Sequence, residues 1–163
     1  MLQGFLESLV GTSIGTTVKT SSWIFQTLEA LHFIGLATLI GGIAALDLRI
    51  LGVAKRLPVA PLHKLLPLVF IGFGINLVTG VLFFLSDPLG YGVNPSFQLK
   101  MVFILLAGLN ALWFELKLAP HVDEWGSGVD ASTHAKIVCG VSLFLWAGII
   151  TAGRLLPSFA ALL

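Results

Sequence analysis

The amino-acid sequence predicts an all-α fold, an integral membrane four-helix bundle preceded by a short amphipathic interfacial helix. Of its 163 residues, 56% are hydrophobic and only 10% are charged, whereas soluble domains have about 25% charged residues. The sequence also contains four apolar stretches, each long enough for the roughly 20 residues that a membrane span needs. Because a segment in lipid must satisfy its own backbone hydrogen bonds, we expect each stretch to be a helix.

Prolines mark the expected boundaries of the four spans. Pro58 and Pro61 precede the second span, and Pro120 and Pro157 follow the third and fourth, as expected for residues that cannot continue a helix. The connections are short, so consecutive spans should be antiparallel. We expect the spans to cover residues 23–51, 62–85, 97–118 and 135–156, which places the bundle in residues 23–163.

Residues 1–22 form a separate N-terminal interfacial segment. Its apolar residues recur at the spacing of a helix with one apolar stripe, which indicates a short helix lying on the outer membrane surface. A cleaved secretory signal is the alternative, but no basic residue precedes the apolar stretch. The stripe consists of Leu2, Phe5, Leu6, Leu9 and Val10.

Positive charges predict the orientation of the bundle, because cytoplasmic ends collect Lys and Arg. The end with the first and third connections holds six such residues: Arg49, Lys55, Arg56, Lys64, Lys117 and Lys136. The other end holds three: Lys19, Lys100 and Arg154. We therefore expect both termini on the non-cytoplasmic side.

Composition and motifs exclude several classes of site. Cys139 is the single cysteine, so an intrachain disulfide or a thiolate metal cluster cannot form. The sequence has no glycine-rich phosphate loop after a strand, and no basic tract long enough for nucleic acid. We expect no nucleic-acid partner, and any chemistry must lie within the helix bundle.

Four ionisable residues converge on the outer half of the bundle. Glu29 and His32 lie about 9 and 14 Å below Trp23 along the first span, with Lys100 one turn into the third span and Arg154 near the outer end of the fourth. Unpaired charges in lipid are costly, so we expect an ion pair of Glu29 with Lys100 or Arg154. Alternatively, the two cations extend to the outer surface along their own stems.

The remaining histidines lie at the inner surface. Imidazole suits iron, copper and zinc, so His63 and His134 are candidate metal ligands, with His121 close by; interfacial side chains are the alternative. No second histidine lies at the depth of His32. An outer haem would therefore combine His32 with Lys100, an open position or a residue of a partner subunit.

Three segments carry a family resemblance: residues 28–52, 94–114 and 145–154. They resemble an uncharacterised bacterial family of small four-helix inner-membrane proteins, a domain of unknown function, which implies a multi-pass protein of the bacterial inner membrane. More distantly, the chain resembles copper-resistance membrane proteins and haem-binding membrane protoporphyrinogen oxidases. That resemblance implies ligation of haem iron or copper by His32, with Lys100 assisting. The family positions are Glu29, His32, Asp47, Arg49, Asn94, Pro95, Lys100 and Arg154.

Three functions remain open from the sequence. The first is a b-type haem electron carrier or redox enzyme that takes electrons from quinol or porphyrinogen, with His32 on the iron and Lys100 or Arg154 holding propionates. The second is a proton or metal transporter that uses Glu29, His32 and Lys100. Because four helices make only a small bundle, a homo-oligomer would have to form its transport pathway. The third is a structural or accessory subunit of a larger membrane complex.

Overall fold

The computed structural model describes residues 2–160, in which all the regular secondary structure is helical and the helices are joined by turns and short loops. Four of these helices are long: α3 (Ser22–Leu51), α5 (Leu66–Ser86), α7 (Pro95–Lys117) and α8 (Thr133–Ala160). Together with α4 (Val59–His63), which leads into α5, they give four stretches long and apolar enough to cross a membrane. The prediction of an all-helical chain with four long apolar helices is confirmed.

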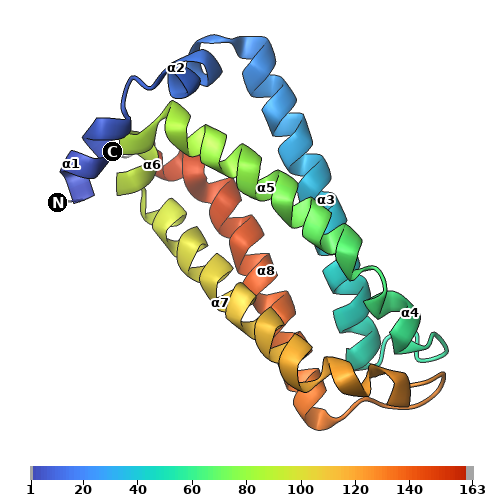
Figure 1. Cartoon of the computed structure of the whole chain (residues 1–163). Helices are drawn as coiled ribbons and strands as arrows, with labels where there is room; N and C mark the ends of the chain where they lie inside the picture. The colour runs from blue at the N-terminus through green and yellow to red at the C-terminus, as the bar shows by residue number, and fades with distance from the viewer. Residues whose placement is uncertain (1, 161–163) are drawn as a thin grey trace.

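The long helices run back and forth between two ends of the molecule (Figure 1). One end, called here the terminal end, carries α1 (Leu2–Leu9), α2 (Ser13–Thr20), α6 (Pro88–Val93), the start of α3 and the end of α8. The opposite end, called the loop end, carries α4, the 3-10 helix η1 (Ala119–Glu124) and the connections beside them. Each long helix therefore joins the two ends.

Local sequence explains where several helices begin and end. Asp87 and Asn94 are N-caps: the Asp87 carboxylate accepts from the Gly90 N–H, the Asn94 side chain accepts from two backbone N–H groups, and a proline follows each cap, as helix starts favour. Gly52 ends α3 in a left-handed conformation, with φ of 108°. In contrast to the expected end at residue 156, α8 continues through Pro157, because a proline one turn from the end removes only one late helical hydrogen bond.

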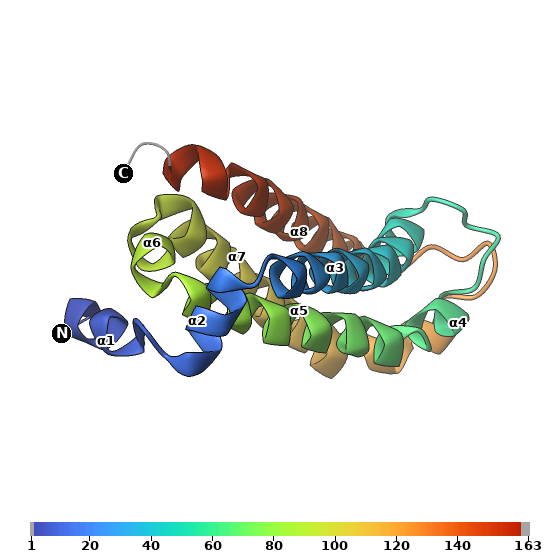
Figure 2. The ribbon, with the colours of Figure 1, turned by 90° about the horizontal axis from the view of Figure 1, so that it is seen from above.

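The bundle consists of two helix pairs. Helix α3 packs against α5 and α7 packs against α8, and the pairs meet where α3 contacts α8, whereas α5 and α7 share no extended contact. Figure 2 shows α3 between α8 and α5. The α3–α5 crossing is close because Gly35 and Gly72 face each other, and a Cβ at either position would meet backbone atoms of the other helix. Small residues at such crossings are typical of membrane helix pairs.

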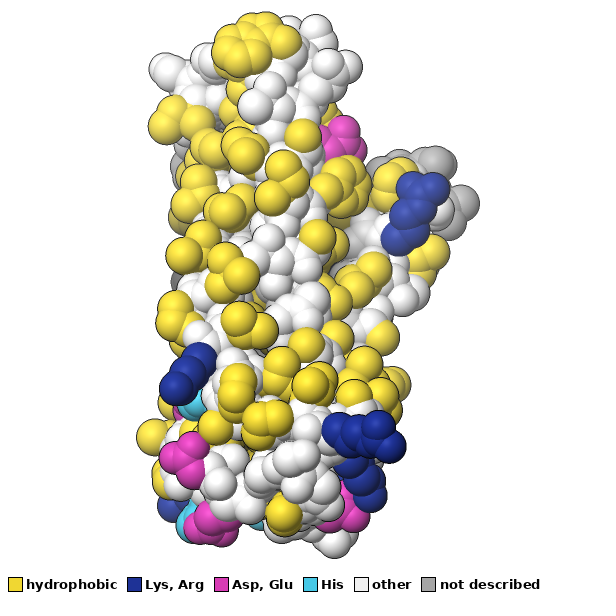
Figure 3. Space-filling view, turned by 90° about the vertical axis from the view of Figure 1, so that its right-hand side faces the viewer, with side chains coloured by type: hydrophobic (Ala, Val, Ile, Leu, Met, Phe, Trp, Pro, Cys, Tyr) yellow, Lys and Arg dark blue, Asp and Glu magenta, His cyan; other side chains and the backbone are white. Residues whose placement is uncertain are grey.

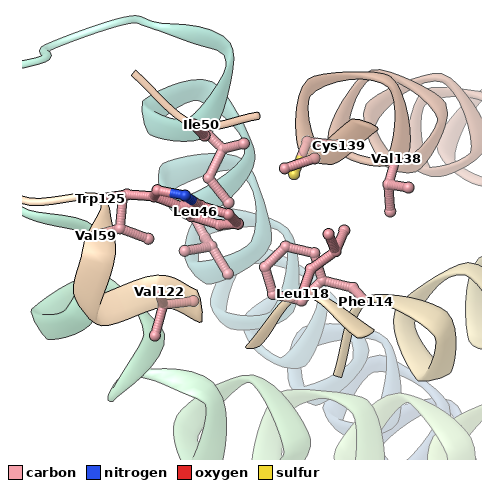
Figure 4. Packing of buried hydrophobic residues seen from close by; sticks show 11 residues of the cluster. Leu46, Ile50, Val59, Phe114, Leu118, Val122, Trp125, Val138 and Cys139 are labelled. Atoms are coloured by element: carbon pink, nitrogen blue, oxygen red, sulfur yellow. The ribbon is translucent and has the colours of Figure 1, made fainter. Parts of the chain in front are cut away.

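The main hydrophobic core lies at the loop end (Figure 4). The Trp125 indole lies beside Val59 and Leu46, where residues of the loops meet the ends of α3, α7 and α8. A second, smaller cluster of Ala107, Leu145 and Ile149 joins α7 to α8 farther along. Outside these clusters the long helices expose many large apolar side chains, which form a broad band above the charged groups of the loop end (Figure 3).

The N-terminal segment forms two helices rather than the single one expected. Gly11, with φ of 79°, ends the first, and Thr12 caps the second by accepting from the Gly15 N–H. Both helices rest on the bundle: Leu6 of α1 packs over Gly92, and Gly15 of α2 lies directly against the Leu85 carbonyl. The segment therefore covers the terminal ends of α5 and α6.

Candidate functional site

The His32 ring is held by Thr79 across the α3–α5 crossing. The His32 Nδ1 atom lies 2.7 Å from the Thr79 hydroxyl oxygen. When that hydroxyl donates its only proton to the Ile75 carbonyl oxygen, at 2.7 Å, Thr79 accepts from His32. In that arrangement the neutral ring carries its proton on Nδ1, and its Nε2 lone pair is free.

Aromatic rings fix the rest of the His32 environment. The edge of the Phe83 ring packs on His32, with ring centroids 5.7 Å apart, and Phe83 in turn packs on Phe25, with centroids 5.2 Å apart. His32 itself is half-buried and Thr79 is buried. The imidazole is thus oriented by one hydrogen bond and one aromatic contact, while part of the ring stays accessible.

Lys100 is the cation that the structure brings toward His32. It is half-buried on α7 and lies near enough to His32 for a Coulombic interaction. No ion pair among residues 2–160 includes it. Its Nζ atom would lie 3.7 Å from a Cβ at position 153, where α8 has glycine, so α8 leaves room for the ammonium group.

Two hydrogen bonds hold Lys100 in place by joining the start of α7 to the end of α8. The Ser96 hydroxyl donates to the Ala152 carbonyl oxygen at 2.8 Å. The Asn94 amide donates to the Leu156 carbonyl oxygen at 3.1 Å. Ser96 and Asn94 are both buried, so these bonds are shielded from competing solvent and fix the register of the two helices.

Glu29 and Arg154 do not join this cluster. Both side chains are exposed, and neither takes part in an ion pair among the described residues. The expected ion pair of Glu29 with Lys100 or Arg154 is therefore absent, because the two helix pairs present these residues outward. The outer site reduces to His32 and Lys100, with Thr79 as the partner that sequence reasoning missed.

The histidines of the loop end are paired separately. His63 lies 3.2 Å from the Glu115 carboxylate, whereas the His134 Nε2 atom accepts from the Trp113 indole N–H at 3.3 Å. Because Glu115 and Trp113 are two residues apart on α7, they point to nearly opposite faces of that helix. The structure thus keeps His63 and His134 on different sides of α7.

His121 is also separate from them, since it pairs with Glu124 at 3.0 Å within η1. Among the described residues, no group of three or more His, Cys, Asp or Glu side chains could hold a metal ion. A multi-residue metal centre at the loop end therefore finds no support in this arrangement.

Arg49 has a structural role that the sequence did not indicate. Its side chain is 2% exposed, and its guanidinium donates to the carbonyl oxygens of Leu57, Gly126 and Val129. It thereby ties together the first and third connections, which belong to different helix pairs. The partners are backbone carbonyls up to 80 positions away, so no residue pattern could identify them.

Asp47 is buried between α3 and α8. It is 5% exposed and lies beside Ser142 and Cys139 of α8, while its Oδ2 atom has no hydrogen-bond partner. Asp47 forms no ion pair with Arg49 or with any other residue that the structure describes.

A cavity of about 330 Å³ opens at the terminal end. Apolar groups from α3 and α8 form one part of its wall, and Lys19 of α2 and Asp87 form a polar part. The Lys19 ammonium and the Asp87 carboxylate are 4.0 Å apart. We call this the terminal-end cavity; its lining residues are Lys19, Phe25, Ser86, Asp87, Gly90, Tyr91, Asn94, Leu156 and Pro157.

Tyr91 is the titratable ring of this cavity wall. Burial, and secondarily the charge of Asp87, raises the pKa of the Tyr91 phenol above its ordinary value of 10.0, so this hydroxyl is protonated at neutral pH. Because Phe25 both lines the cavity and packs on Phe83, the cavity lies one aromatic layer away from His32.

The sequence matches no protein-family profile, no curated protein and no solved structure. Inference about function therefore rests on the geometry of these sites.

Proposed function

We propose that the chain is a multi-pass protein of the bacterial inner membrane that binds a b-type haem through the Nε2 atom of His32. Membrane insertion is supported by four helices with mean hydropathy of 1.7 to 2.4 over their most apolar windows. It is also supported by the apolar band of Figure 3, which would be unstable in water over such an area. With positive charges concentrated at the loop end, that end faces the cytoplasm.

The observation that carries haem ligation is the hydrogen bond from His32 to Thr79. Histidines that bind metals almost always donate their other ring N–H to an oxygen acceptor, which fixes the tautomer and the ring orientation. The contact of His32 with Thr79 supports this arrangement, with Nδ1–H donating to the hydroxyl oxygen and Nε2 as the electron-pair donor.

The other residues around His32 fit a haem in part. Lys100 is a half-buried cation within electrostatic reach of His32 that forms no ion pair within residues 2–160, and it is suited to a haem propionate. The three other histidines pair with residues toward the loop end, so His32 would be the one histidine of the described residues to hold the group. A haem held there would supply one-electron redox chemistry, with quinol or another redox protein as its partner.

The test is an absorption spectrum of the purified chain titrated with haem. We expect a Soret band with wild type, its loss in His32→Ala, and its retention in the matched control His121→Ala, which changes an exposed histidine paired only with Glu124. Helical content measured by circular dichroism checks that each variant folds. A wild type that binds no haem, or a His32→Ala variant with an unchanged band, refutes the proposal.

Thr79 gives a second, more specific test. Thr79→Val removes the acceptor for Nδ1–H with almost no change in shape, so we expect haem affinity to fall about 10- to 100-fold, as for loss of other partners of metal-binding histidines. Thr79→Ser keeps the hydroxyl and should bind nearly as wild type does. Equal affinities for the two variants would remove Thr79 from the binding site.

A further inference from the structure

The charged wall of the terminal-end cavity carries two opposite charges that are only loosely paired. Lys19 and Asp87 lie 4.0 Å apart, beyond hydrogen-bond distance, and their side chains are 65% and 55% exposed. Exposed pairs of this kind contribute little to stability. Both charges are therefore available to a ligand that offers a better partner to each.

The same two residues separate two hollows. A second cavity of about 270 Å³, lined by α2 and the end of α5, shares Lys19, Ser86 and Asp87 with the terminal-end cavity. The charged pair therefore lines both cavities. A small group that enters either cavity can reach the ammonium and the carboxylate together.

Another part of the terminal-end cavity wall is apolar. Phe25 of α3 lies on one side, and Leu156 and Pro157 near the end of α8 lie on the other. These residues belong to the ends of long apolar helices, the level at which headgroups meet hydrocarbon in a bilayer. The cavity therefore presents a charged pair to the polar layer and an apolar cleft to the acyl layer.

We propose that the terminal-end cavity binds a zwitterionic phospholipid of the phosphoethanolamine class, with its phosphate on Lys19 and its primary amine on Asp87. A primary ammonium donates hydrogen bonds to a carboxylate and a phosphate accepts them from lysine, so one headgroup satisfies both side chains. The start of the acyl chains lies along the apolar cleft. The proposal rests on the membrane location proposed above and is independent of haem binding.

The experiment is a lipid titration of the detergent-purified full chain, with thermal unfolding followed by tryptophan fluorescence. A ligand that binds only the folded state raises the unfolding temperature in a concentration-dependent way. We expect phosphatidylethanolamine to stabilise at lower concentration than phosphatidylglycerol, which lacks the amine, and than phosphatidylcholine, whose quaternary amine cannot donate. Equal stabilisation by all three lipids refutes the proposal.

Two variants and two controls locate the effect. Asp87→Asn keeps an N-cap for α6 because asparagine caps helices as well as aspartate does, and Lys19→Gln keeps most of the stem. Each should raise the half-stabilising concentration of phosphatidylethanolamine about tenfold or more, as expected for loss of a charge-assisted hydrogen bond. Asp123→Asn and Lys64→Gln, exposed at the loop end, should leave it unchanged.

A soluble headgroup distinguishes the source of the ligand. Glycerophosphoethanolamine, which has no acyl chains, should stabilise only at far higher concentration because it cannot fill the apolar cleft. If it acts at the same concentration as the lipid, or if Asp87→Asn responds as wild type does, the lipid assignment is wrong. The haem titration of His32→Ala does not depend on either result.

Discussion

Replacing Gly72 by alanine tests whether the α3–α5 crossing holds the His32 site together. A Cβ at position 72 would lie 2.8 Å from the Gly35 carbonyl oxygen and 2.8 Å from the Leu39 backbone nitrogen. Both are backbone atoms, which cannot rotate away as a side chain can. To restore an ordinary contact of 3.4 Å, the two helices must separate by about 0.6 Å.

The expected loss of stability follows from two opposing effects. Overpacking a close contact costs about 1–3 kcal/mol, while alanine in a helix is favoured over glycine by about 1 kcal/mol. Gly72→Ala should therefore lower the free energy of unfolding by up to about 2 kcal/mol. The control is Gly74→Ala, two residues along α5, where a Cβ would meet nothing within 4 Å and only the helix-favouring effect applies.

The measurement is reversible unfolding in mixed micelles, titrated with a denaturing detergent and followed by circular dichroism. We expect Gly74→Ala to be more stable than Gly72→Ala by about 1–3 kcal/mol, the overpacking cost alone. A second measurement, the nitrogen chemical shifts of the His32 ring, should show a smaller population of the Nδ1-protonated tautomer in Gly72→Ala but not in Gly74→Ala. If the two variants have the same stability and the same His32 shifts, the close crossing does not support the site.

Two further predictions concern the loop end. Arg49→Met leaves three loop carbonyls without their donor, so the free energy of unfolding should fall by about 2 kcal/mol or more. Amide hydrogen exchange should become faster in residues 52–58 and 125–132, and unchanged exchange there would contradict the role of Arg49. The pKa of Asp130 is held below its ordinary value of 3.8, first by the hydrogen bond from Lys55 and then by Lys136. Because the folded-state pKa is lowered, this contact contributes its full stability above pH 3.8, and that stability is lost as the pH falls through the folded-state pKa. Amide hydrogen exchange in the loops should therefore rise in that pH range in wild type but not in Asp130→Asn.

The long helices could be predicted from the sequence because length and hydropathy define them. The first expected span, residues 23–51, differs from α3 by one residue at its start, and the third, 97–118, by two at its start and one at its end. The short helix α6 was missed, although Asp87 with Pro88 is a helix-start pattern. The fourth expected span ends too early, at residue 156, because Pro157 predicts a helix end whereas α8 continues through it.

The candidate site was less predictable, for a physical reason. In a soluble helix the apolar stripe identifies the inner face, but nearly all faces of these spans are apolar, so periodicity does not say which residues meet. The cost of placing them in lipid singles out His32 and Lys100 from the sequence, and in the structure the two lie within Coulombic range of each other. The Thr79 partner, 47 residues from His32, and the outward positions of Glu29 and Arg154 depend on helix rotation, which the sequence does not encode locally.

The position of the core at the loop end also bears on how the two helix pairs can move. At that end a continuous apolar cluster around Trp125 and the Arg49 contacts join the two pairs. At the terminal end the Ser96 and Asn94 bonds join α7 to α8 within one pair, so they do not resist a tilt of one pair against the other. Such a tilt would pivot at the loop end and change the spacing between His32 on α3 and Lys100 on α7.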